Sequence, residues 1–340
     1  MPAIRRAVDA SNGQLGLALL GVGLGALPAM VLTGRLAERV GFRLVPLTLA
    51  AFAVAGALPA LAGSPWSLFA LMLVLGATSG ALDVAINTRA SAVEQALRVR
   101  VLDGMHAGFS AGVVVGGIGT GLLRRAAAEP RAILAGVAVV VLCVAAANVR
   151  AEPLPVVSTA RAALARPLVV VGAVLLLAFL IESGVENWSA LFIENGLHAS
   201  PAVSGLGPGL FAAAMVVGRA LAQHAAPESA AVRIAIAGSA AAAGLVVASI
   251  AQHPVVALAG FVAAGAGLGL SAPTLFRAAG RLGAGPAIST VAVLGYLGFT
   301  VGPPLIGAVT AASGLRGGVA FLAAASALLV ATAPILRRLG

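Results

Sequence analysis

Two glutamates, Glu182 and Glu186, lie one helical turn apart within a long apolar run, and Ser189 follows three residues later. This spacing places the three side chains on one face of a helix. Two carboxylates at this separation repel each other when both are ionised, so one of them readily takes up a proton. We therefore predict a proton-exchange or substrate-binding site here. Glu182 is the better candidate, because Glu186 and Trp188 lie toward the helix end, where tryptophan commonly marks a membrane interface.

A second apolar run carries Gly76, Gly80, Asp83 and Asn87 at spacings that again define one helix face. The glycines permit close approach of a neighbouring helix. Because an ionisable group is costly inside a bilayer, Asp83 and Asn87 are candidates for coupling or binding. A structural hydrogen bond, or a salt bridge from Asp83 to an arginine of another helix, is an equal alternative.

Two further polar residues are candidates for the same site. His106 begins another apolar run and could relay protons, since histidine titrates near physiological pH; a helix-end histidine satisfied by Asp103 is the alternative. Tyr296, the only tyrosine, faces either a cavity or the packed core. It lies in the densest group of helix-breaking residues within a run, which predicts either a gating hinge or a static kink. These residues are Gly298, Gly302, Pro303 and Pro304.

The elements that position these residues are predicted to be membrane-spanning helices. Of 340 residues, 60% are hydrophobic and 9% are charged, whereas soluble proteins carry about 25% charged residues. Eleven apolar runs approach the length of about 20 residues that a helix needs to cross a bilayer. They are residues 14–33, 44–63, 66–90, 104–124, 131–149, 167–193, 204–223, 231–250, 255–276, 286–312 and 316–336. The predicted fold class is an all-α integral membrane protein.

The charged residues argue against several other classes of protein. All 21 basic residues are arginine and the net charge is +10, but the arginines fall between apolar runs rather than on one aromatic-rich face, so nucleic-acid binding is not expected. Because the sequence contains no lysine, it cannot form the phosphate-binding loop that requires one. This excludes an ATP-driven pump made of this single chain. No combination of serine, histidine and aspartate for nucleophilic catalysis can be assembled from sequence order alone, and no spacing indicates a metal site, so we expect no enzyme, cofactor or metal. The single Cys143 cannot form an internal disulfide.

Internal similarity predicts two related halves. The polar stretch 150–166 is interpreted as a cytoplasmic linker between a five-helix half, 1–149, and a six-helix half, 167–340. The segment starting at Gly34-Arg35 is similar to that starting at Gly218-Arg219, and a second pair of glycine motifs is repeated at nearly the same offset, 186 residues against 184. This offset leaves 167–193 without an N-terminal counterpart. We therefore expect a six-plus-six plan whose first helix is missing.

The distribution of the arginines predicts which side of the membrane each loop occupies. Residues 1–13 are interpreted as an extramembrane loop, with a signal peptide as the alternative. If the 34–43 turn lies in the cytoplasm, 15 of the 21 arginines fall in cytoplasmic segments. The positive-inside rule then predicts a cytoplasmic C-terminus.

The turn at 34–43 resembles the loop signature of the major facilitator superfamily, G-x-L-[AS]-[DE]-R-x-G-R-[KR], and departs from it at Phe42. In that family the signature joins the second and third helices, which again implies a missing first helix. Glycines at both ends permit a tight reversal, and the charged residues between them are expected to form a conformational latch. The expected latch residues are Gly34, Arg35, Glu38, Arg39, Gly41 and Arg43, with Gly218 and Arg219 in the second half.

Three other stretches, 80–94, 103–112 and 182–189, look like a bacterial branch related to fucose-permease-like sugar transporters. The resemblance implies two pseudo-symmetric bundles that rock about a central site. It further implies a monomer in the lipid bilayer of the bacterial inner membrane, moving a sugar or other small metabolite with protons. Two alternatives remain: an exporter of the same fold, and a degenerate, non-transporting sensor or scaffold, since the missing helix lines the cavity in the family.

Overall fold

The computed structural model describes residues 1–40, 43–97, 102–149, 165–224 and 229–337, and within these ranges the chain is helical without strands. This confirms the predicted all-α class. The elements are α1 (Pro2–Ala7), α2 (Asn12–Val40), α3 (Leu44–Ala57), η2 (Leu58–Leu61), α4 (Pro65–Leu97), α5 (Leu102–Arg125), α6 (Pro130–Ala147), α7 (Arg166–Leu191), η3 (Phe192–Gly196), α8 (Pro201–Ser204), α9 (Leu206–His224), α10 (Ala230–Ile250), α11 (Pro254–Leu268), α12 (Ser271–Ala331) and α13 (Ala333–Arg337).

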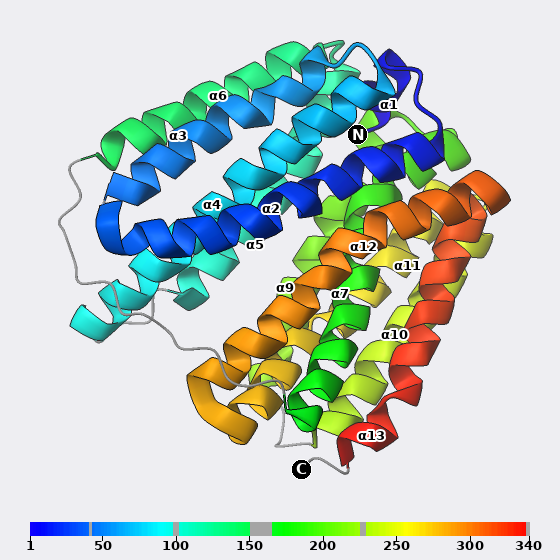
Figure 1. Cartoon of the computed structure of the whole chain (residues 1–340). Helices are drawn as coiled ribbons and strands as arrows, with labels where there is room; N and C mark the ends of the chain where they lie inside the picture. Colours follow the sequence, from blue (N-terminus) through cyan, green and yellow to red (C-terminus); the bar gives the residue numbers. More distant parts are fainter. Residues whose placement is uncertain (41–42, 98–101, 150–164, 225–228, 338–340) are drawn as a thin grey trace. The chain divides into compact units, whose positions relative to one another are not determined.

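Nine helical segments in the described part of the chain are long and apolar enough to cross a membrane, against eleven predicted. One of the nine, Thr290–Arg337, has 48 residues, which is enough for two crossings. It contains Gly314, whose φ of +75° is a left-handed conformation that glycine adopts without strain. Figure 1 accordingly draws α12 as an orange segment followed by a red segment that returns toward α13. The break predicted between 312 and 316 therefore coincides with this glycine.

The first long helix extends beyond its predicted end. We expected a tight reversal starting at Gly34, but α2 continues through Val40, so this expectation is wrong. The residues after Gly34 include leucine, alanine, glutamate and arginine, all strong helix formers, which favour continuation of the helix. The next helix, α3, takes Arg43 as its N-cap.

The structure describes only some of the residues of the predicted latch. Gly41 lies outside the described residues, and the side chains of Glu38 and Arg39 also lie outside what is described. Arg35 is an exposed helical residue of α2. The latch in this half therefore stays a prediction.

The start of the chain is also more ordered than expected. Residues 1–13, interpreted as a loop, contain the short helix α1. Its Arg5 donates a hydrogen bond to the side chain of Asn12 at the start of α2. Burial and the neighbouring charge of Arg6 lower the pKa of the Arg5 guanidinium.

Helix contacts divide the chain into two compact units, each described by itself. Unit 1 comprises Met1–Pro2, Ser110–Arg125 and Thr159–Gly340, and unit 2 comprises Ala3–Phe109 and Ala126–Ser158. The chain thus passes from one unit to the other within α5. The predicted division into 1–149 and 167–340 with a linker at 150–166 stays a prediction, since residues 150–164 lie outside the described part.

Unit 2 is built on a glycine-mediated contact between α2 and α4. A Cβ atom added to Gly21 would lie 2.8 Å from the carbonyl oxygen of Phe69, and one added to Gly80 would lie 2.6 Å from that of Ala26. Gly25 and Gly76 approach the facing backbone more closely still. This confirms the prediction that the glycines of the second polar run permit close helix approach.

Replacing Gly76 by alanine is expected to destabilise the protein, because the added methyl group would collide with the backbone of Val22, which cannot rotate away. Overpacking of this kind costs about 1–3 kcal/mol. Gly56 of α3 is a matched control, since a Cβ there meets nothing within 4 Å. Thermal unfolding of the detergent-purified variants measures the difference. Equal midpoints for Gly76→Ala and Gly56→Ala would contradict the packing argument.

Candidate functional site

The candidate site lies on α7, in unit 1. Pro167 occupies the first turn of this helix, where its missing N–H costs no hydrogen bond. Most residues of α7 are buried, and most of these are apolar. The candidate membrane span that contains α7 continues through the π-helical turn η3 to Gly196. Glu182 and Glu186 interrupt this apolar surface and are only partly buried. Ionisable groups within a spanning helix are functional candidates because their burial is costly.

Glu182 pairs with Arg219 of α9. The distance between Glu182 Oε1 and an Arg219 terminal nitrogen is 3.8 Å, and the side chains are 13% and 30% exposed, respectively. Glu186 lies within electrostatic range of both groups. The structure therefore brings together a residue predicted for coupling and one predicted for the latch, an association that the sequence analysis missed.

Glycine packing positions Arg219. A Cβ on Gly218 would collide with the carbonyl of Ala266, so α9 and α11 approach each other closely at this point. The Arg219 Nε is buried and finds no hydrogen-bond partner among the described residues. The guanidinium thus retains unused donor capacity next to the two carboxylates.

Three aromatic rings pack together about one turn from Glu182. The Phe179 and Phe299 ring centroids are 4.7 Å apart, and Tyr296 lies 6.5 Å from Phe179 and 6.1 Å from Phe299. Ser183 Oγ donates to the carbonyl oxygen of Phe299 at 3.4 Å, which ties α7 to α12 at the level of Glu182. Tyr296, predicted to face either a cavity or the core, therefore belongs to an aromatic cluster that meets α7 at Phe179, three residues before Glu182.

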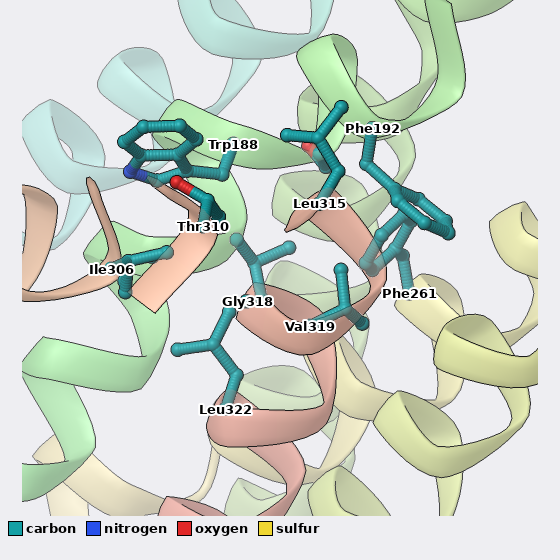
Figure 2. A pocket seen from close by; sticks show the side chains of 12 residues that line it. Trp188, Phe192, Phe261, Ile306, Thr310, Leu315, Gly318, Val319 and Leu322 are labelled. Carbon is teal, nitrogen blue, oxygen red and sulfur yellow. The ribbon is translucent and has the colours of Figure 1, made fainter. Parts of the chain in front are cut away.

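Trp188 lies in a different environment from the glutamates. It is 2% exposed, and with Ser189 and Thr310 it lines a cavity of about 10 Å³, shown in Figure 2. A space of this size holds at most one water molecule. Trp188 is therefore packed inside unit 1, and its assignment to substrate binding stays a prediction.

The candidates of α4 belong to unit 2. The side-chain amide of Asn87 donates to Asp83 Oδ1 at 3.0 Å and to the Asp83 carbonyl oxygen at 2.8 Å. The structural hydrogen bond considered as an alternative is thus present. His106 is a helical residue of α5, but its side chain lies outside what the structure describes.

The predicted hinge residues lie within α12. Gly298 and Gly302 allow this helix to approach the backbone of α7 at Leu176 and Leu180. Pro303 and Pro304 follow without ending the helix. Close packing therefore accounts for the glycines in this conformation, and the gating role stays a prediction.

A second polar cluster, not predicted from the sequence, lies elsewhere in unit 1. Arg124 of α5 makes two hydrogen bonds of 2.7 Å with the two carboxylate oxygens of Glu194 in η3, and Ser204 Oγ of α8 donates to the same carboxylate at 2.7 Å. The ion-pair side chains are only 12% and 6% exposed. One feature of the sequence could have indicated this pair: Arg124 and Glu194 both lie at ends of apolar runs that are predicted to be on the same side of the membrane.

Close helix approach accompanies this ion pair. A Cβ on Gly117 would lie 2.9 Å from the carbonyl oxygen of Gly205, and one on Gly121 would lie 2.8 Å from that of Pro201. The second half of α5 therefore crosses α8 and the start of α9 at backbone contact. Such packing leaves little room for water around the pair formed by Arg124 and Glu194.

A helical chain with nine candidate spans among its described residues belongs to the class of multi-pass membrane proteins. A family model described as Major Facilitator Superfamily matches residues 1–284. The chain belongs to this superfamily, whose members are membrane transporters.

Similar proteins include an uncharacterized MFS-type transporter of Yersinia pestis, 32% identical over 98% of this chain and 88% of that protein. An uncharacterized transporter of Sinorhizobium fredii is 29% identical over 99% and 93% of the two chains. The membrane protein MosC of Rhizobium meliloti is 27% identical over 97% and 83%.

Solved structures support the same fold. A bacterial homologue of the human lysosomal transporter Spinster, in an inward-facing and occupied conformation, has a TM-score of 0.80 at 14% identity, covering 99% of this chain and 91% of that one. The nucleoside transporter NupG has a TM-score of 0.72 at 12% identity, covering 98% and 93%. At these identities the likeness establishes the fold alone.

Proposed function

We propose that this chain is a proton-coupled secondary transporter of a small organic solute, with Glu182 as the coupling residue. The observation that carries the proposal is the partly buried pair between Glu182 and Arg219, with Glu186 one turn away in the same spanning segment. One guanidinium compensates only one of the two carboxylates, so the pair of glutamates can take up a proton or a substrate group, and protonation of Glu182 would release Arg219 from its partner. Binding then shifts the equilibrium between conformations by its differential affinity for them.

The finer features of the proposal come from the sequence. They are the fucose-permease-like branch, a monomer in the bacterial inner membrane and a cytoplasmic C-terminus. The proposed sugar or metabolite substrate rests on that resemblance. Asp83, Asn87 and His106 are proposed as additional binding or relay residues in the other half.

Replacing Glu182 by glutamine is expected to reduce solute-dependent proton movement at least tenfold, because the amide cannot take up and release a proton. Proteoliposomes with an imposed pH gradient, exposed to pooled sugars, amines and small metabolites, provide the measurement. Glu129→Gln is the matched control, since this carboxylate is exposed at the start of α6 and outside the spanning segments; its flux should stay within twofold of wild type. Proton flux that survives in Glu182→Gln would overturn the assignment, and no flux from folded wild-type protein would favour a non-transporting role.

A further inference from the structure

The charge of the α7 site does not balance. Glu182 and Glu186 carry two formal negative charges when ionised, and Arg219 supplies one positive charge at 3.8 Å from Glu182. With both carboxylates ionised, the cluster of three therefore carries one net negative charge within a spanning segment, as far as the described residues show. An unpaired charge in such surroundings is costly, so the site favours a ligand that brings a positive charge.

The aromatic cluster lies next to the carboxylates on the same helix. Phe179 precedes Glu182 by three residues, which places both side chains on one face of α7. Phe299 and Tyr296 of α12 complete the cluster, and the hydrogen bond from Ser183 to the Phe299 carbonyl fixes α12 at this level. Aromatic rings present negative faces that attract cations, and they also pack against apolar groups.

Other solute classes fit this arrangement less well. An anion would meet two carboxylates and only one guanidinium, which is already paired with Glu182. A neutral polyol would bring no charge to compensate the second carboxylate.

We propose that the solute is a small organic cation, whose protonated amine binds the carboxylates of Glu182 and Glu186 and whose apolar part packs on Phe179, Tyr296 and Phe299. All five residues belong to unit 1. The inference rests on the proposed function, because it names the class of solute for the same site. It makes the carboxylates the source of charge selectivity and the rings the source of shape selectivity.

Binding rather than transport tests the inference. The purified chain in lipid nanodiscs is titrated by calorimetry with phenethylamine, its neutral analogue phenylethanol and the anion phenylacetate. We expect phenethylamine to bind at least tenfold more tightly than either analogue. Glu182→Gln and Glu186→Gln should each weaken amine binding at least tenfold, Phe299→Leu should weaken it about threefold to tenfold, and Glu129→Gln should leave it unchanged.

Several results would overturn the inference. These are equal binding of amine and alcohol, preference for the anion, full amine binding in both glutamine variants, and failure of a monodisperse wild-type sample to bind this amine or benzylamine at millimolar concentration. Proton flux driven by a neutral sugar in the liposome assay, without amine binding, would retain the proposed transporter and reject the cation. Amine binding without any flux would retain the site and reject transport.

Discussion

Replacing Arg124 by methionine is expected to lower the thermal unfolding midpoint of the purified protein by about 10 °C. The substitution removes the guanidinium that makes two hydrogen bonds with the Glu194 carboxylate, whose side chain is 6% exposed in the intact protein, and it keeps the hydrogen bond from Ser204. Removing one partner of a buried ion pair costs about 3–5 kcal/mol, because the other charge stays desolvated. Glu194→Leu strands the guanidinium instead and should act in the same direction.

The double variant separates this electrostatic effect from loss of packing. In Arg124→Met/Glu194→Leu both charges are gone, so most of the lost stability should return, since a buried pair replaced by apolar groups is often neutral or stabilising. Arg125→Met is the matched control, because this neighbouring arginine is exposed. A double variant no more stable than the single ones would show that the contact acts through shape rather than charge.

The sequence predicts the spanning helices well and their partners poorly. Hydrophobic runs located α7 within a few residues, and the spacing of Gly76 and Gly80 correctly predicted close approach to another helix. Periodicity specifies which side chains share a face, but it does not specify which element faces them. The pairing of Glu182 with Arg219, and of Arg124 with Glu194, depends on how helices far apart in the chain pack.

Local sequence signals also compete with one another. The glycine at position 34 predicted a reversal, but strong helix formers follow it and α2 continues to Val40. Gly314, in contrast, lies between two predicted runs, and its left-handed φ of +75° coincides with the break predicted there. A glycine in a membrane helix is therefore ambiguous between a turn and a packing contact until the facing backbone is known.

Replacing Gly298 by leucine is expected to cost about 3–5 kcal/mol and to reduce the yield of monodisperse protein sharply. A Cβ at this position would collide with the Leu176 carbonyl and would lie 2.9 Å from the Leu180 backbone nitrogen. Neither atom belongs to a flexible side chain, so α12 would have to move away from α7. This movement would also separate Phe299 from Phe179, whose ring centroids are now 4.7 Å apart.

A comparison within the same helix checks this expectation. At Gly280 the nearest atom to an added Cβ is the end of the Ile288 side chain at 3.5 Å, so alanine there should be tolerated. Thermal unfolding and size-exclusion chromatography of Gly298→Ala, Gly298→Leu and Gly280→Ala measure the trend. If space is the cause, Gly298→Leu is less stable than Gly298→Ala, whereas Gly280→Ala keeps the unfolding midpoint of the wild type. A stable Gly298→Leu variant with reduced solute flux would instead support the predicted hinge, because the glycine would then act through motion rather than through packing.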